Sequence, residues 1–318
     1  MTKENPVLVL ASGDDPQLAM LREVPHTICS EIGACPGPGR DPTVILQWSG
    51  TPELLHRALA SCPDVRWIHS RAAGVDNLLF PEIVNSEVLL TNGSGVFSAS
   101  LGEFVLGAIL YFAKDFRRMV RNQMAERWEP FDVQGIDRQT VGIVGYGDIG
   151  RAVASRVKPL GMRVLATKRH LPALPDSLVE HFYKPEERRE MIAASDYVVA
   201  TAPLTAETRH MIGEAEFAVM KASAVVINVG RGPVIDEAAL VGALTAKRIK
   251  GAALDVSEHE PLPAGHPLYK LENVLLSPHC ADHTVDWQDQ AMRFFLEQYQ
   301  SFQNGEPLRN VVDKRHGY

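Results

Sequence analysis

Short apolar runs alternate with amphipathic segments along most of the chain. In the first third, the runs Val7–Leu10, Val44–Trp48 and Trp67–Ser70 are bounded by turn-forming residues and predict buried strands. Segments 17–24 and 53–61 lie between these runs and carry apolar residues at helical spacing. Strands that alternate with helices form parallel sheets covered on both faces, so this part of the chain predicts an α/β domain.

A long apolar helix is predicted over Ser100–Phe112, and we interpret it as the crossing from a first domain into a second. The last helical segment, Asp286–Asn304, is expected to return and pack on the first domain. The first domain is therefore predicted to be discontinuous, because both ends of the chain contribute to it. The predicted domains are residues 1–97 with 285–318, and residues 98–284.

A second alternating series follows the crossing helix. It starts with a strand at Thr140–Val144, a helix over Arg151–Leu160 and a strand at Arg163–Ala166. Four further apolar runs complete a pattern of six strands: 197–200, 224–229, 251–256 and 274–277. We therefore predict an α/β fold with two doubly wound parallel-sheet domains, the first flavodoxin-like and the second of the Rossmann type.

A glycine-rich turn, Gly-Tyr-Gly-Asp-Ile-Gly, stands between the strand Thr140–Val144 and the next helix. Gly145 permits a tight turn, Gly147 lets backbone N–H groups approach a pyrophosphate, and Gly150 allows the helix to pack closely on the strand. The positive end of the helix dipole then faces the phosphates. An ordinary strand-to-helix turn is the alternative, but this context favours a dinucleotide site. Its predicted residues are Gly145, Tyr146, Gly147, Asp148, Ile149 and Gly150.

The end of the second strand in such a domain selects the cofactor. NAD-using enzymes place Asp or Glu there, where it accepts a hydrogen bond from the ribose 2′-hydroxyl. This chain has Lys168 and Arg169 instead, and these cations suit the 2′-phosphate of NADP. We therefore predict a preference for NADP(H). NAD(H) stays possible if both cations are only solvated surface groups.

Three polar residues stand at or just after the ends of successive predicted strands: Arg231, Glu260 and His279. In an open parallel sheet the ligand binds at that edge. Reduction of a 2-oxo acid needs a cation that binds the carboxylate and polarises the carbonyl, which suits the planar fork of Arg. It also needs a proton donor near neutral pH, which suits His, and a neighbouring Glu would orient the imidazole. The set predicts hydride transfer between a dinucleotide and a small 2-hydroxy or 2-oxo acid.

Composition narrows the class of protein. The chain has 318 residues and a formal net charge of −7, which argues against a general nucleic-acid-binding protein. No Cys/His cluster has metal-ligand spacing, so no metal site is predicted. The run Val7–Leu10 is too short for a signal peptide or a membrane span, so we expect a cytoplasmic protein without a membrane partner. Buried or free thiols are expected at all four cysteines: Cys29, Cys35, Cys62 and Cys280.

Taken together, the motifs resemble those of the D-isomer-specific 2-hydroxyacid dehydrogenases, a family that includes glyoxylate/hydroxypyruvate reductases and phosphoglycerate dehydrogenases. They occur in the family's order over nearly the whole chain. The matching stretches are Ser70–Asn77, Gly142–Gly150, Thr201–Thr205, Asn228–Gly232, Ala253–Pro261 and Leu276–His279. Lys168 stands where NAD-using members carry Asp, which resembles the NADP-preferring glyoxylate reductases.

The resemblance implies a role for each matching residue. Arg231 would bind the substrate carboxylate and carbonyl, His279 would be the general acid/base, and Glu260 would be its partner. Backbone N–H groups at Ala73, Gly74 and Val75 would hold the substrate carboxylate. Asp255 would contact the nicotinamide carboxamide. The other implied cofactor contacts are Thr201, Ala202, Pro203, Val229 and Gly230. Family members are typically dimers through the cofactor domain, so a homodimer is expected.

Other functions stay open. A phosphite, formate or phosphoglycerate dehydrogenase of the same family is one alternative. Formate-type members carry Gln where this chain has Glu260, and the end of the chain at Tyr318 disfavours the longer phosphoglycerate enzymes. A non-enzymatic dinucleotide sensor is another alternative. Trp48 and Trp128 could wall a substrate site, but buried core positions are expected for both.

Overall fold

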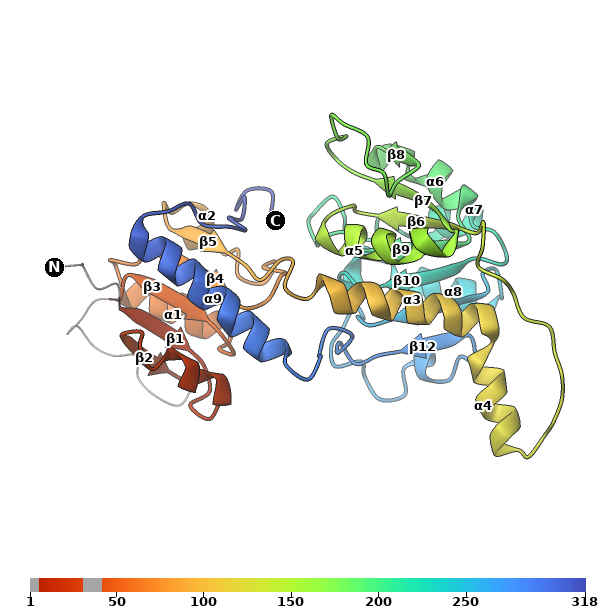
Figure 1. Cartoon of the computed structure of the whole chain (residues 1–318), viewed down its shortest axis with the longest axis horizontal. Coiled ribbons are helices and arrows are strands. Elements are labelled where there is room, and N and C mark those ends of the chain that lie inside the picture. The colour runs from red at the N-terminus through yellow and green to blue at the C-terminus, as the bar shows by residue number, and fades with distance from the viewer. Residues whose placement is uncertain (1–5, 31–41) are drawn as a thin grey trace. The chain divides into compact units, whose positions relative to one another are not determined.

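The computed structural model describes residues 6–30 and 42–318. The chain divides into two compact units, Met1–Phe97 with Val285–Tyr318 and Ser98–Thr284 (Figure 1). The first is here called the smaller unit and the second the larger unit. Each unit is built on a parallel sheet with its own hydrophobic clusters.

The sheet of the smaller unit has the strand order β2-β1-β3-β4-β5 and is parallel throughout. Its strands are β1 (Val7–Leu10), β2 (His26–Cys29), β3 (Val44–Gln47), β4 (Trp67–Ser70) and β5 (Leu89–Thr91). This is the flavodoxin-like order that the sequence predicts. The apolar pattern does not reveal two of these strands, because β2 is partly exposed and β5 is short.

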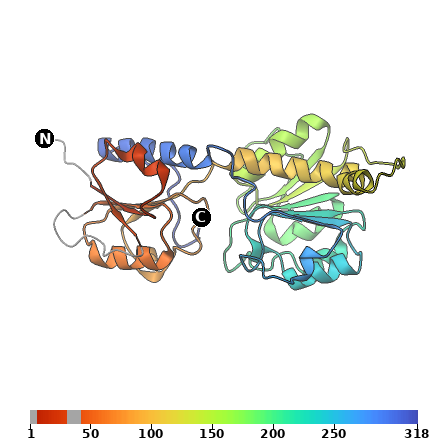
Figure 2. The same ribbon diagram turned by 90° about the horizontal axis from the view of Figure 1, so that it is seen from below.

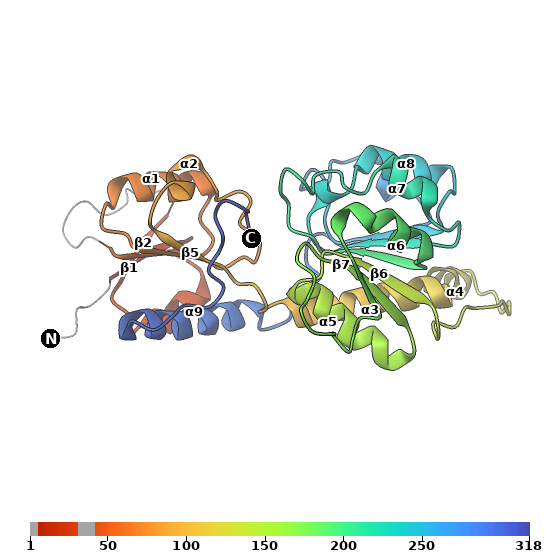
Figure 3. The ribbon, with the colours of Figure 1, turned by 90° about the horizontal axis from the view of Figure 1, so that it is seen from above.

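Helices cover both faces of this sheet (Figures 2 and 3). One face carries α1 (Pro52–Ser61) and α2 (Pro81–Val84), and the other carries α9 (Trp287–Asn304) and the short helix η1 (Pro16–Leu21). On α9, Met292 and Phe295 are fully buried in the same cluster as Trp67 of β4. The last helix therefore packs on the sheet of the first strands, as the sequence predicts.

The larger unit has a seven-stranded parallel sheet in the order β12-β11-β10-β9-β6-β7-β8. Its strands are β6 (Thr140–Val144), β7 (Arg163–Thr167), β8 (His181–Tyr183), β9 (Tyr197–Ala200), β10 (Val225–Asn228), β11 (Gly251–Leu254) and β12 (Val274–Leu276). The six predicted strands are all present, and the short edge strand β8 is additional. The chain runs outward from β6 to β8 and then returns to β9 on the other side of β6. Such a reversal is where doubly wound sheets bind their ligands.

The helices of the larger unit also form two layers (Figure 3). One layer contains α3 (Ser98–Lys114) and α5 (Asp148–Val157), and the other contains α6 (Arg188–Ala194), α7 (Glu214–Val219) and α8 (Glu237–Thr245). α3 and α5 approach so closely that a Cβ on Gly102 would lie 3.0 Å from the carbonyl of Ala152. Helix α4 (Phe116–Met124) follows α3 and leads into an irregular segment before β6. No helix in the described ranges is long and apolar enough to cross a membrane.

The cysteines differ from expectation at one position. Cys62 is a buried free thiol and Cys280 an exposed one, as expected. Cys29 is disulfide-bonded, which corrects the prediction of a reduced thiol there. Such a bond depends on how closely two chain segments approach, and residue spacing alone does not reveal that distance. Cys35 lies outside the described residues.

Candidate active site

The glycine turn lies at the reversal point of the larger sheet, between the ends of β6 and β9. Gly145 has φ +93°, and a Cβ there would lie 2.6 Å from the Cα of Ala202. Its N–H donates to the hydroxyl of Thr167 (3.0 Å), and its carbonyl accepts from the hydroxyl of Thr201 (2.6 Å). Only glycine fits here, because both the backbone conformation and the packing exclude a side chain.

The other two glycines of the turn have different surroundings. A Cβ on Gly150 would lie 3.0 Å from the Cγ2 atom of Ile143 in β6, so α5 packs directly on the strand. A Cβ on Gly147 would have no atom within 4 Å, and no side chain caps the start of α5. The start of α5 therefore has free space beside Gly147 and no side-chain cap on its first N–H groups. Residues Gly147 to Gly150 fit a dinucleotide pyrophosphate there.

Lys168 follows β7 directly, next to this turn. Its backbone N–H donates to the carbonyl of Tyr183 in β8 (3.0 Å), and its Nζ atom lies 5.6 Å from the ring centre of Tyr146. Lys168 is half-buried and Arg169 is exposed. The two predicted cations therefore stand at the carboxyl end of β7, beside the turn.

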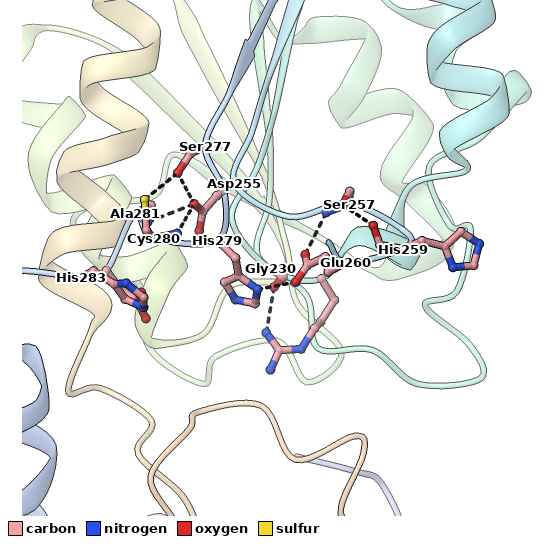
Figure 4. A network of polar contacts seen from close by, with 12 residues as sticks. Gly230, Asp255, Ser257, His259, Glu260, Ser277, His279, Cys280, Ala281 and His283 are labelled. Carbon is pink, nitrogen blue, oxygen red and sulfur yellow. Dashed lines mark hydrogen bonds and ion pairs between the residues drawn. The ribbon is translucent and has the colours of Figure 1, made fainter. Parts of the chain in front are cut away.

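His279 and Glu260 form a close pair at the same edge of the sheet (Figure 4). His279 Nδ1 lies 2.6 Å from Glu260 Oε2, and Glu260 Oε1 accepts from the backbone N–H of Ser257 (3.0 Å). Both side chains are partly exposed. The hydrogen bond with Glu260 raises the pKa of His279. Burial raises the pKa of Glu260, but its hydrogen bonds from His279 and Ser257 outweigh burial and lower that pKa overall.

These pKa directions favour one arrangement of the protons in the pair. A carboxylate with a lowered pKa is ionised near neutral pH and can only accept hydrogen bonds, so His279 Nδ1 carries a proton. The Nε2 atom of His279 is then the atom that can release or take up a proton. Because the pKa of the imidazole is raised, the doubly protonated form persists to higher pH than in an ordinary histidine.

Asp255 organises the loop that carries His279. Its side chain is buried, and its Oδ1 atom accepts hydrogen bonds from the Ser277 hydroxyl (2.6 Å) and from the N–H groups of Cys280 and Ala281 (both 3.0 Å). Its carbonyl accepts from the N–H of His279 (2.8 Å). His279 itself has φ +54°, which is unusual for a residue with a side chain. The Asp255 contacts hold this conformation in place.

Arg231 follows β10 and is placed by contacts of its backbone. Asn228 donates from Nδ2 to the Arg231 carbonyl (3.0 Å) and accepts at Oδ1 from the Gly230 N–H (3.1 Å). A Cβ on Gly232 would lie 1.8 Å from the Ser257 carbonyl oxygen, so this turn packs against the loop of Glu260. The charge of Arg231 contributes to lowering the pKa values of both Glu260 and His279. The three predicted catalytic side chains are therefore close enough for the charge of Arg231 to act on both Glu260 and His279.

The remaining predicted cofactor residues follow neighbouring strands of the same sheet. Thr201, Ala202 and Pro203 follow β9, and Val229 and Gly230 follow β10. Among them Pro203 is exposed, whereas Thr201 and Ala202 are buried. In the described part of the chain, no group of three or more His, Cys, Asp or Glu residues could hold a metal ion.

The predicted substrate-carboxylate residues lie in the smaller unit, directly after β4. Asn92 is buried and donates from Nδ2 to the carbonyl of Ala73 (2.6 Å), while its Oδ1 atom accepts from the N–H of Ser94 (3.1 Å). The contact turns the Ala73 carbonyl toward Asn92 and fixes the loop through Gly74 and Val75.

The family follows from the comparison with known sequences. Residues 106–281, more than half of the chain, match the model of the D-isomer specific 2-hydroxyacid dehydrogenase NAD-binding domain. The chain belongs to the D-isomer specific 2-hydroxyacid dehydrogenase family. The dehydrogenase accordingly binds a nicotinamide dinucleotide, and its glycine turn lies within the matched region.

Individual relatives support the same family. A glyoxylate reductase of Korarchaeum cryptofilum is 36% identical over 262 residues, which is 80% of this chain and 78% of that protein. A D-3-phosphoglycerate dehydrogenase of Methanocaldococcus jannaschii is 31% identical over 278 residues, which is 86% of this chain and 52% of that protein.

Two solved structures resemble the whole dehydrogenase. A family member from Xanthobacter autotrophicus Py2, in complex with NADPH and MES, has a TM-score of 0.86 and 32% identity over 98% of this chain and 99% of that one. An NADPH-dependent glyoxylate/hydroxypyruvate reductase from Sinorhizobium meliloti, in complex with NADP and sulfate, has a TM-score of 0.85 and 26% identity over 99% and 100% of the two chains.

The dehydrogenase also contains residues near these sites that the sequence did not single out. Asn92 holds the loop of Ala73, and the carboxylate of Asp176 accepts a hydrogen bond from Tyr146 in the glycine turn (3.0 Å). No motif marks either residue, because each acts through the fold of a loop.

Trp48 is buried, as expected, but Trp128 is 98% exposed, which corrects the expectation of a core position. Trp128 lies in the irregular segment after α4, where no sheet covers it.

The His279–Glu260 pair generates the first testable prediction. Replacement of Glu260 by Gln removes the charge that favours the imidazolium, so the pKa of His279 should fall. An NMR titration of the imidazole signals measures this shift directly. Glu258→Gln is the matched control, because Glu258 pairs with His210 (2.8 Å) and not with His279. An unchanged His279 titration in the Glu260 variant would contradict the arrangement described above.

Proposed function

We propose that this dehydrogenase reduces a short 2-oxo acid, such as glyoxylate or hydroxypyruvate, to the D-2-hydroxy acid with NADPH. The observation that carries the proposal is the His279–Glu260 pair, whose pKa values respond to the charge of Arg231. The names of the glyoxylate reductase relatives and of the Sinorhizobium meliloti enzyme support the substrate class.

The proposed chemistry divides between these side chains. Arg231 binds the substrate carboxylate and polarises the 2-oxo group, because its planar N–H fork matches carbonyl and carboxylate oxygens. His279 donates a proton from Nε2 to the oxygen of that group, and Glu260 stabilises the imidazolium before the transfer. The reduced nicotinamide supplies the hydride to the carbonyl carbon.

The dinucleotide is held by residues of the larger unit in this proposal. The glycine turn and Thr201, Ala202 and Pro203 contact the pyrophosphate and adenosine, and Val229 and Gly230 lie along the cofactor. Asp255 contacts the nicotinamide carboxamide, in addition to its contacts with the His279 loop. Lys168 and Arg169 bind the 2′-phosphate and create the preference for NADPH.

The reaction is tested with a panel of 2-oxo acids that includes glyoxylate, hydroxypyruvate and 3-phosphohydroxypyruvate. Arg231→Ala should lower kcat/KM for the preferred acid by about 100-fold or more, because a charge-assisted contact to the reacting group is lost. His279→Gln should abolish reduction while NADPH binding, measured by titration, stays nearly unchanged.

Arg248→Ala and His259→Gln are matched controls, since both side chains are exposed in the same unit. Wild-type turnover in the Arg231 variant would overturn the assignment. Preferential use of 3-phosphohydroxypyruvate would replace the proposed substrate, and NADPH binding without any turnover would favour a dinucleotide sensor.

Cofactor preference is tested by exchanging the charges after β7. The double variant Lys168→Asp/Arg169→Ala should lose affinity for NADPH and gain affinity for NADH, because a carboxylate at position 168 can accept from the ribose 2′-hydroxyl. The ratio of kcat/KM with NADPH to that with NADH should fall by about tenfold or more. If the ratio does not change, the 2′-phosphate is recognised elsewhere.

We further propose a cytoplasmic homodimer formed through the larger unit. Helix α4 and the segment after it expose several large apolar side chains, and Met124 (83%) and Trp128 (98%) are the most exposed among them. Such a cluster favours burial against a second copy of the chain.

The double variant Met124→Glu/Trp128→Glu should therefore sediment as a monomer, whereas the wild-type enzyme should sediment as a dimer. Analytical ultracentrifugation makes this comparison. Leu174→Glu is the control, because Leu174 is 79% exposed on another segment of the same unit. A dimer that persists in the double variant would place the interface on a different surface.

A further inference from the structure

We propose that Asp176 is a positioning residue for cofactor selectivity, because its carboxylate ties the segment 168–180 to the glycine turn and orders Lys168 for the 2′-phosphate. The inference rests on the proposed use of NADPH. It adds a residue that lies outside the glycine motif and outside the cations at the end of β7.

The segment 168–180 connects β7 to β8 and forms neither helix nor strand. Two of its large apolar side chains, Leu171 and Leu174, are exposed. Packing therefore does not hold the first half of the segment. The chain becomes anchored at Asp176, after which Leu178 and Val179 pack on the core cluster of α3 and α5.

Asp176 makes contacts in two directions. Its Oδ1 atom accepts from the N–H of Leu178 (3.0 Å), within the segment. Its Oδ2 atom accepts from the hydroxyl of Tyr146 (3.0 Å) and from the guanidinium of Arg151. Tyr146 belongs to the glycine turn, and Arg151 belongs to α5. The side chain of Asp176 is only 13% exposed. A carboxylate that accepts at both oxygens is a fixed link between the segment and the turn.

The protonation states suit a permanent link. Burial, followed by the hydrogen bond to Asp176, raises the pKa of Tyr146 to about 12, so the phenol stays a donor at physiological pH. Burial opposes ionisation of Asp176, but its hydrogen bonds from Leu178 and Tyr146 and the charge of Arg151 lower the pKa overall. The Asp176 carboxylate therefore stays ionised and keeps its ion pair with Arg151.

The link reaches Lys168 through the ring of Tyr146. The ring is buried, and it contacts Phe182 of β8 edge to face with centres 5.2 Å apart. The Nζ atom of Lys168 lies 5.6 Å from the centre of the same ring. With its hydroxyl tied to Asp176, the ring is a rigid surface on which the ammonium group is ordered by a cation–π contact. An ordered cation loses less conformational entropy when it binds a phosphate, which favours NADPH over NADH.

The distribution of charges also supports Lys168 as a ligand of the 2′-phosphate. The positive charge of Arg151 is compensated by Asp176, whereas the described contacts of Lys168 include no carboxylate. The charge of Lys168 is therefore available to the 2′-phosphate, together with that of Arg169 in the proposed site. If Asp176 instead kept Arg151 from the phosphate, its removal would strengthen NADPH binding, so the two roles predict opposite effects.

The test uses the full chain with Asp176→Ala and with Tyr146→Phe, which keeps the ring and removes only the hydroxyl. Glu180→Gln is the matched control, because Glu180 ends the same segment but pairs with Arg163 (2.6 Å) away from the turn. Affinities for NADPH and NADH are measured by titration. Amide hydrogen exchange of peptides that cover residues 168–180 is measured without cofactor.

Asp176→Ala should weaken NADPH binding by about tenfold and NADH binding much less, and it should speed exchange of the Leu178 amide, whose acceptor is removed. Tyr146→Phe should act in the same direction to a smaller extent, and Glu180→Gln should match the wild type. An unchanged or increased NADPH-to-NADH affinity ratio in Asp176→Ala, or unchanged exchange, would overturn the inference. A wild-type protein that binds NADPH no better than NADH would instead overturn the proposed cofactor preference, whatever the exchange result.

Discussion

Close approach of backbones at the carboxyl edge of the larger sheet is the constraint on which the site depends. A Cβ at Gly145 would lie 2.6 Å from the Cα of Ala202, and a Cβ at Gly232 would lie 1.8 Å from the carbonyl oxygen of Ser257. The first contact joins the turns after β6 and β9, and the second joins the Arg231 turn to the Glu260 loop. Because these turns touch without side chains between them, groups from several strands meet within one small region.

Carboxylates then fix the side chains that this packing brings together. Asp255 holds the loop of His279 through three hydrogen bonds to one oxygen atom, and Glu260 orients the imidazole ring. Beside the glycine turn, Asp176 links an irregular segment to Tyr146 and Arg151. In all three cases an acidic group accepts several hydrogen bonds. These bonds lower the free energy of the carboxylate relative to one that is buried without a partner. Although the chain has a net negative charge, some of its acidic residues thus hold basic side chains in place.

Much of this arrangement could be predicted from the sequence. The alternation of apolar runs indicates both sheets, and the Gly145–Gly150 turn follows a strand as a dinucleotide turn must. Arg231, Glu260 and His279 were identifiable because each follows a predicted strand, and parallel strands end at one edge. Asp176 and Asn92 were not, since their partners lie 30 and 19 positions away and depend on loop conformation. The apolar pattern does not reveal strands β2 and β5, because it fails for short or half-exposed strands. The disulfide at Cys29 and the exposure of Trp128 likewise depend on tertiary structure.

The position of α9 has a consequence for the order in which the protein can fold during synthesis. The larger unit is one continuous stretch, Ser98–Thr284, and all of its strands are translated before α9. The smaller unit begins first but cannot complete its core, because Met292 and Phe295 of α9 cover the face of β1, β3 and β4 that contains Trp67. The apolar face of its first strands therefore stays uncovered while the whole of the larger unit is translated. In the cell, this nascent sheet is the part of the chain with the longest need of protection by a chaperone.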